Sequence, residues 1–250
     1  MNEGSGSRGR ARSVWLFDLD DTLHNASGAA FGPINRAMTD YIMRELAVTE
    51  PEADQLRRQY WQRYGATLLG LMRHHGVSAA HFLHHTHVLP GLESRLHAHP
   101  HDVAALRRLP GCKFVLTNAP AAYADRVLRQ LGLSACFDGV ISIEQMRMFG
   151  QLRPKPDRRM FRALLARLRV PASRCVLVED TLAHQKAAHG LGLHTVWMLR
   201  WHRRSTVAGL AGGRPNRGRR PPYVCDRIHG LHQLSRLPGR AACPPSFPTI

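Results

Sequence analysis

The chain has 250 residues, of which 44% are hydrophobic, and its formal net charge is +17. This length and apolar content suffice for one large domain, or for a core domain with an insert, and exclude disorder as the main state. No segment approaches the roughly eighteen apolar residues of a membrane span, and residues 1–13 contain no apolar signal segment, so we expect a cytoplasmic protein without a membrane partner.

The positive charge is distributed unevenly. Seven arginines and no acidic residue lie between positions 200 and 220. Without that segment the chain is moderately basic, which suits an anionic small molecule as well as a polyanion. Because Trp201 is the one aromatic residue interleaved with these arginines, the segment is more typical of a solvated linker than of a nucleic-acid-binding region.

Apolar runs and helical patterns alternate through most of the chain. A first strand is predicted at 14–17, and four more apolar runs follow at 114–117, 140–143, 176–178 and 195–198. Amphipathic helical patterns lie between the later runs. This alternation predicts an α/β fold with a doubly wound parallel sheet, a Rossmann-like core.

The predicted domain organisation places a helical cap inside this core. The core comprises 14–23 and 109–201, the cap 24–108, and a final strand and helix lie within 223–237. Residues 1–13 and 238–250 are expected to be disordered or loose tails, and 202–222 a basic linker. In the cap, one helix starts near Phe31 with Pro33 in its first turn, and another is predicted over 53–71.

Two carboxylates directly follow the first predicted strand. Asp18 and Asp20 lie in the sequence Asp-Leu-Asp-Asp-Thr, where the side chains would face the crevice at the carboxyl edge of the sheet. Such a pair can divide the roles of nucleophile and proton carrier. The alternative is a solvated acidic turn.

Three other segments also place polar groups just beyond predicted strands. They are Thr117-Asn118, Lys155 between two prolines, and Glu179-Asp180. Considered separately, Lys155 could be a surface lysine, and Asp180 could mark a helix N-terminus. Together with Asp18 and Asp20, however, these segments resemble the four motifs of the haloacid dehalogenase superfamily of phosphotransferases.

The resemblance implies a Mg²⁺-dependent phosphatase that works through an aspartyl-phosphate. Asp18 would be the nucleophile, Asp20 the general acid and base, and Lys155 the compensating cation. Mg²⁺ would be bound by Asp18, Asp180 and the backbone carbonyl of Asp20. Thr117 and Asn118 would bind the phosphoryl oxygens with Lys155. In the dehalogenating branch the second carboxylate is replaced, so Asp20 favours phosphoryl chemistry.

A narrower resemblance concerns the substrate. Five segments resemble the pyrimidine 5′-nucleotidase family: 17–26, 64–71, 117–119, 153–156 and 178–181. This resemblance implies a role in nucleotide metabolism, with nucleoside monophosphates such as UMP and CMP as substrates. Tyr64 would then contact the nucleoside, although Tyr60 and Tyr64 at helical spacing are also typical core residues. One position departs from the pattern, because His184 stands where this branch commonly has Asp or Asn.

Other functions remain open on the sequence alone. A phosphatase of the same superfamily could act on sugar phosphates or phosphoglycolate, and a basic protein with an inactive core could bind nucleic acid. Nine of the sixteen histidines lie between 74 and 101, but no carboxylate or cysteine joins them at ligand spacing, which favours surface histidines over a zinc site. The sequence does not fix the oligomeric state.

Overall fold

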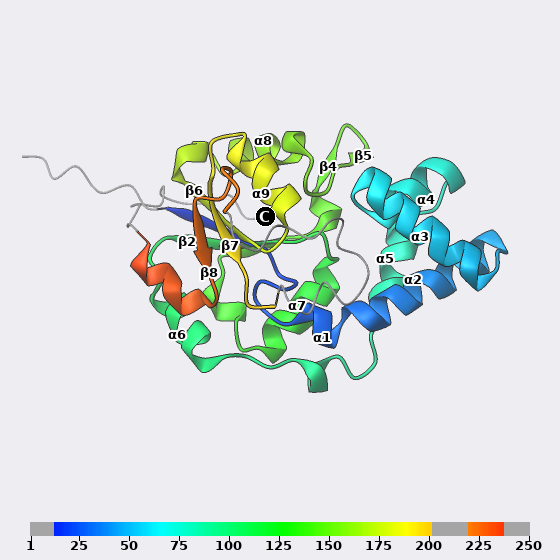
Figure 1. Ribbon diagram of the computed structural model, residues 1–250, viewed down its shortest axis with the longest axis horizontal. Helices are drawn as coiled ribbons and strands as arrows, with labels where there is room; N and C mark the ends of the chain where they lie inside the picture. Colours follow the sequence, from blue (N-terminus) through cyan, green and yellow to red (C-terminus); the bar gives the residue numbers. More distant parts are fainter. Residues whose placement is uncertain (1–12, 202–219, 238–250) are drawn as a thin grey trace, which may run out of the picture.

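The computed structural model describes residues 13–201 and 220–237. Its central feature is a six-stranded sheet in the order β3-β2-β1-β6-β7-β8 (Figure 1), in which every neighbouring pair is parallel. The strands are β1 (Val14–Phe17), β2 (Cys112–Leu116), β3 (Gly139–Ile141), β6 (Cys175–Glu179), β7 (His194–Met198) and β8 (Asp226–Ile228). A separate antiparallel pair consists of β4 (Arg147–Met148) and β5 (Gln151–Leu152). The predicted doubly wound parallel sheet is confirmed.

Helices cover both faces of the sheet because its strands are apolar on both sides. On one face, Trp15 and Phe17 of β1 pack in a cluster with residues of α6 (Pro100–Arg108) and α7 (Ala121–Gln130). On the other face, Val14 and Leu16 pack with α8 (Arg158–Arg167) and α9 (Leu182–His189). The core therefore has three layers.

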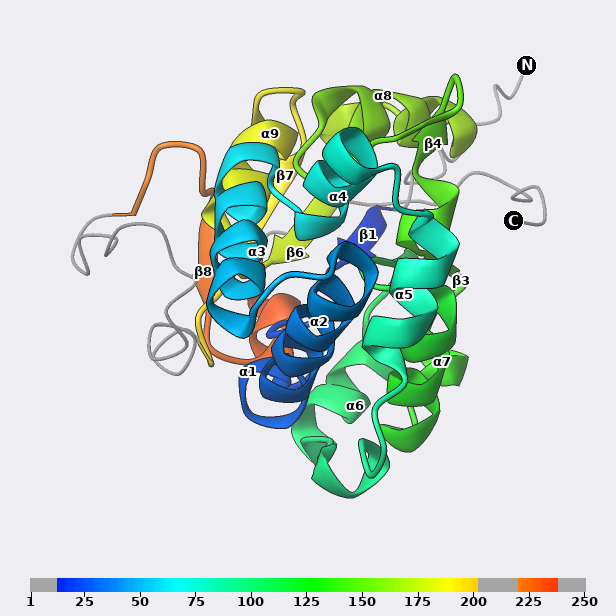
Figure 2. The ribbon, with the colours of Figure 1, turned by 90° about the vertical axis from the view of Figure 1, so that its right-hand side faces the viewer.

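Four helices form a cap beside the carboxyl edge of the sheet (Figures 1 and 2). They are α2 (Phe31–Leu46), α3 (Glu50–Tyr64), α4 (Thr67–His75) and α5 (Ala79–His87), and the short α1 (Ala26–Ala29) leads into them from the core. The cap has its own apolar cluster, which includes Tyr41, Tyr60 and Phe82. Ile143, which precedes the β4-β5 hairpin, and Leu152 of β5 join that cluster, so the cap packs against this part of the core.

The structure differs from the prediction within the insert. The single helix expected over 53–71 is two helices, α3 and α4, separated at Gly65, whose φ is 79°. Helix α6, expected in the cap, packs on the sheet instead, since Leu106 belongs to the sheet cluster and the Asp102 carboxylate pairs with Arg200 beyond β7. The helices that stand apart therefore span 31–87.

The ends of the chain are described only in part. Strand β8 and a 3-10 helix, Leu231–Arg236, occupy the region predicted to hold a final strand and helix. Most of the predicted tails and of the basic linker lies outside the described residues. Within 13–201 and 220–237, no helix is long and apolar enough to cross a membrane.

Candidate active site

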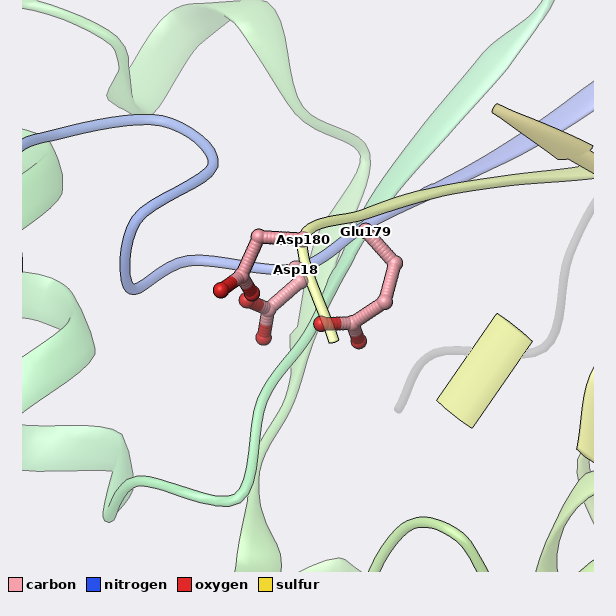
Figure 3. Close-up of side chains that lie close together, drawn as sticks. All are labelled: Asp18, Glu179 and Asp180. Atoms are coloured by element: carbon pink, nitrogen blue, oxygen red, sulfur yellow. The ribbon is translucent and has the colours of Figure 1, made fainter. Parts of the chain in front are cut away.

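Three carboxylates meet where β1 and β6 end. Asp18 follows β1, and Glu179 and Asp180 lie at the end of β6 and just beyond it. Phe17 is in register with Val178, and the Asp18 N–H donates to the Val178 carbonyl at 2.9 Å. The residues that follow the two strands therefore lie at the same edge of the sheet. Carboxylate oxygens of the three residues lie within 4.8 Å of one another (Figure 3).

Lys155 inserts one ammonium group between two of these carboxylates. Its Nζ lies 2.6 Å from Asp18 Oδ1 and 2.8 Å from Glu179 Oε2, and its side chain is 1% exposed. Burial disfavours the charged ammonium, but Asp18 and Glu179 outweigh burial and raise the pKa of Lys155 above its usual range. The structure thus brings together Asp18, Lys155 and Asp180, which the sequence analysis assigned to one site.

The charges at the site are not balanced by Lys155 alone. Burial raises the pKa of Asp18 well above its usual range, and the charge of Glu179 adds to the effect. Burial, Glu179 and Asp18 likewise raise the pKa of Asp180. Burial also disfavours charge on Glu179, yet Lys155 and His184 hold its pKa below the usual range. Glu179 is thus contacted by both Lys155 and His184, whereas Asp18 shares Lys155 with it, and the neighbouring carboxylates add to the effect of burial on Asp180.

This donor set fits Mg²⁺. Magnesium prefers hard carboxylate oxygens and is bound through one or two carboxylates together with waters and substrate phosphate. Asp18 and Asp180 supply that number, while Glu179 is engaged by Lys155 and His184. Within 13–201 and 220–237, the three carboxylates are also the one group of potential metal ligands that lie this close together.

Thr117 and Asn118 follow β2, at the same edge of the sheet. The Asn118 side-chain amide donates to the Lys155 carbonyl and accepts from the Lys155 N–H, both at 2.9 Å. It therefore holds the backbone of Lys155, a role that the sequence analysis did not assign. Thr117 Oγ1 accepts from the Ala119 N–H at 3.0 Å, so its hydroxyl hydrogen can be donated elsewhere.

Asp20 lies beside the carboxylate group and has two partners that the sequence analysis missed. Tyr123 Oη donates to Asp20 Oδ1 at 2.8 Å, and His24 Nε2 lies 2.9 Å from the same oxygen. His24 could have been noticed four residues after Asp20. Tyr123 could not, because it lies 103 residues from Asp20 and nothing in its local sequence points to this contact.

His184 has a defined place at the motif where the sequence departs from the family pattern. Its Nδ1 lies 2.9 Å from Glu179 Oε2, the oxygen that also contacts Lys155. The imidazole therefore holds Glu179 in position beside Lys155.

Tyr64 lies at the end of α3, where the cap meets the core. Its hydroxyl lies 2.6 Å from His74 Nε2. The next residue, Gly65, is close enough to the loop of Lys155 that a Cβ atom there would lie 3.5 Å from Pro156 Cδ. Other cap histidines also pair with tyrosine hydroxyls: His81 with Tyr41 at 2.9 Å and His75 with Tyr60 at 2.7 Å.

Comparison with known proteins assigns the family. The model of haloacid dehalogenase-like hydrolases matches residues 14–192. The chain therefore belongs to the haloacid dehalogenase-like hydrolase family.

Among curated proteins, the chain is 23% identical over 203 residues to Phosphate metabolism protein 8 of Saccharomyces cerevisiae. The aligned region covers 76% of this chain and 62% of that protein. The chain is also 36% identical over 99 residues to Protein SUPPRESSOR OF QUENCHING 1, chloroplastic, of Arabidopsis thaliana. That aligned region covers 37% of this chain and 9% of that protein. The chain thus spans less than two thirds of the length of either relative.

Solved structures share the fold. A putative hydrolase, YfnB, from Bacillus subtilis bound to magnesium superposes with a TM-score of 0.54 at 16% identity, covering 91% of this chain and 98% of that one. An L-2-haloacid dehalogenase from Xanthobacter autotrophicus with chloropropionic acid covalently bound superposes with a TM-score of 0.52 at 17% identity. This superposition covers 90% of this chain and 98% of that one.

Proposed function

We propose that this hydrolase is a Mg²⁺-dependent phosphatase that cleaves phosphate monoesters through an aspartyl-phosphate on Asp18. The observation that carries the proposal is the contact of 2.6 Å between Asp18 Oδ1 and the buried ammonium of Lys155, with Asp20 beside them. A phosphate dianion repels a carboxylate nucleophile, so the site needs cations before the two can approach in line. Lys155 is one such cation. Asp18 and Asp180 would hold Mg²⁺, which supplies the remaining positive charge.

The residues divide the reaction into two steps. In the first, an oxygen of Asp18 forms a bond to phosphorus, the bond from phosphorus to the ester oxygen breaks, and Asp20 gives its proton to that oxygen. In the second, Asp20 takes a proton from water as the water oxygen bonds to phosphorus and the bond to Asp18 breaks. Thr117, with nearby backbone N–H groups, would donate to the phosphoryl oxygens.

Asp20 distinguishes this chemistry from dehalogenation. An alkoxide is a poor leaving group and must be protonated as it departs, whereas a halide leaves as a stable anion. A second carboxylate next to the nucleophile therefore supports phosphate esters over haloacids as substrates.

We further propose nucleoside 5′-monophosphates, pyrimidine nucleotides such as UMP and CMP above all, as the substrates. The resemblance of five segments to pyrimidine 5′-nucleotidases supports this class, and the name of the yeast relative refers to phosphate metabolism. The turn after Tyr64 lies against Pro156 next to Lys155, which supports a role for Tyr64 in contacting the leaving group.

Turnover of a substrate panel tests the proposal. UMP, CMP, dUMP, AMP, phosphoglycolate, sugar phosphates and 2-chloropropionate are assayed with Mg²⁺ and with excess chelator. We expect Mg²⁺-dependent phosphate release, fastest with UMP or CMP. Asp18→Asn should abolish it, and a beryllium fluoride mimic should attach at Asp18. Asp20→Asn should lower kcat/KM for UMP by roughly 10²- to 10⁴-fold.

Each alternative predicts a different result. Faster turnover of a sugar phosphate or phosphoglycolate would keep the chemistry and change the substrate class. Halide release from 2-chloropropionate without phosphate release would overturn the phosphatase proposal. Salt-sensitive binding of RNA or DNA without any turnover would favour the nucleic-acid-binding alternative.

A further inference from the structure

Among residues 13–201 and 220–237, the partners of the Asp20 carboxylate hold it from one side only. Both of its protein contacts, from Tyr123 and His24, are made to Oδ1. We propose that Tyr123 and His24 are positioning residues that fix Oδ1, so that the other oxygen, Oδ2, gives and takes the catalytic proton. This inference rests on the proposed function, in which Asp20 is the general acid and base.

Both partners are buried and act as hydrogen-bond donors. The Tyr123 and His24 side chains are each 1% exposed. Burial and the nearby Asp20 charge raise the pKa of Tyr123 well above its usual range, so its hydroxyl keeps its proton and donates it. The distances of 2.8 Å and 2.9 Å are those of good hydrogen bonds to a carboxylate.

The tautomer of His24 follows from its other nitrogen. His24 Nδ1 is buried, and no residue of the described chain contacts it by a hydrogen bond. A buried N–H without an acceptor is rarer and costlier than a buried lone pair without a donor. Of the two ring nitrogens, Nε2 therefore carries a proton, which it donates to Asp20.

Two donors on one oxygen determine where the catalytic proton is carried. A carboxylate oxygen has two lone pairs, and both lone pairs of Oδ1 are engaged by Tyr123 and His24. The Asp20 side chain is 18% exposed, and no described residue donates to its Oδ2. Oδ2 is thus the oxygen that can carry a proton to the ester oxygen and later accept one from water.

The two positioning residues come from different parts of the fold. His24 is in the same turn as Asp20, and the two residues form an isolated β-bridge. Tyr123 lies in α7, just after Thr117 and Asn118. The contact therefore ties the segment that carries the nucleophile to the segment expected to bind phosphate, and one orientation of Asp20 is kept relative to both.

The test compares an ester that needs protonation with one that does not. UMP loses an alkoxide, whereas p-nitrophenyl phosphate loses a phenolate that leaves readily without a proton. We use kcat/KM, because it reports steps only up to release of the leaving group and is insensitive to the later attack of water, which also needs Asp20. The variants are Tyr123→Phe, His24→Leu, His24→Gln and Asp20→Asn.

For Tyr123→Phe and His24→Leu, we expect kcat/KM for UMP to fall roughly 10- to 100-fold, the usual effect of removing a group that orients a functional residue. With p-nitrophenyl phosphate the fall should stay below about threefold, because protonation contributes little to that cleavage. His24→Gln keeps a donor at similar reach and should recover most of the UMP activity. Tyr41→Phe, which removes a tyrosine hydroxyl in the cap, is the control and should leave both substrates unchanged.

Titration with the beryllium fluoride mimic counts the competent active sites in every variant, so a misfolded fraction can be corrected for. Equal losses with both substrates after that correction would overturn the positioning role, as would unchanged UMP turnover in Tyr123→Phe and His24→Leu. A wild-type protein that cleaves neither ester would overturn the proposed function itself, and the inference with it. A selective loss in Asp20→Asn alone would retain the proposed function and reject the inference.

Discussion

The buried ammonium of Lys155 stabilises the fold as well as the site, because it is the partner of two carboxylates. Removing one member of a buried ion pair leaves the other charge uncompensated, at a cost of about 3–5 kcal/mol. We expect Lys155→Met to lower the free energy of unfolding by about 3 kcal/mol and to reduce kcat/KM at least about 10²-fold. Urea unfolding and UMP turnover measure the two effects.

The control for this variant is Lys186→Met, which removes an exposed lysine from α9. It should change the free energy of unfolding by no more than about 0.5 kcal/mol. If Lys155→Met were as stable as this control, Lys155 would not be compensating Asp18 and Glu179.

His87 makes stability depend on pH. It ends α5, and its ring centroid lies 5.7 Å from that of Tyr123. Burial lowers the pKa of His87 from 6.5 to about 4, against the opposing effects of Asp20, the Leu83 carbonyl and Glu144. The folded state therefore binds fewer protons than the unfolded state between these values, and stability falls as the pH is lowered through that range.

From this shift we expect the contribution of His87 to lower the free energy of unfolding by about 2 kcal/mol when the pH falls from about 7.5 to about 5. Urea unfolding at the two pH values measures it. His87→Phe should remove most of this contribution, whereas His84→Asn, an exposed position on the same helix, should retain it. An unchanged pH dependence in His87→Phe would show that burial does not lower the pKa of His87 in the folded protein.

The residues of the site differ in how far the sequence could predict them. Asp18, Thr117 and Asp180 could be placed at one edge because each follows an apolar run that becomes a strand of the same parallel sheet. The contacts of Asp20 with Tyr123, and of Asn118 with the Lys155 backbone, depend on how loops fold over that edge. Such contacts join residues far apart in the chain, and no periodic pattern encodes them.

At the scale of helices and strands, the strands were predictable and the cap only in part. The break between α3 and α4 was missed because the apolar pattern continues through Leu68 and Leu71, and a helix interior tolerates a single glycine. At Gly65, however, the backbone has a φ of 79°, which ends α3 and reverses the chain toward α4. Helix α6 was misplaced because its pattern shows an apolar face without showing which surface covers that face.

The packing of α3 against α4 depends on a glycine. A Cβ atom at Gly70 would lie 2.1 Å from Tyr60 Cγ, so the two helices approach closely there. We expect Gly70→Ala to destabilise the protein by about 1–3 kcal/mol through overpacking. Urea unfolding measures this change.

A matched substitution separates close packing from helix propensity. A Cβ atom at Gly32 in α2 would meet nothing within 4 Å, so Gly32→Ala should be neutral or stabilising by up to about 1 kcal/mol. Equal effects of the two substitutions would mean that the approach of α4 to Tyr60 is not tight.

For the whole molecule, folding is what creates the proposed cation site. Lys155 and Asp18 are 137 residues apart in the chain, and Asp180 comes from a third segment. An unfolded chain does not hold these groups together. A cation that needs this arrangement therefore binds only the folded state and stabilises it by mass action.

We expect Mg²⁺ at about 100 times its Kd to raise the free energy of unfolding by about 2.7 kcal/mol. Asp180→Asn should lose most of this response, because it removes one of the two proposed carboxylate ligands. Without Mg²⁺ the same variant should be more stable than the wild type, since burial, Glu179 and Asp18 all disfavour a charge at position 180. Urea unfolding with Mg²⁺ and with chelator gives both comparisons.

Asp226→Asn, which removes a carboxylate paired with His194 on the edge strand β8, is the control and should respond to Mg²⁺ as the wild type does. An undiminished Mg²⁺ response in Asp180→Asn would place the bound ion away from the edge where β1 and β6 end.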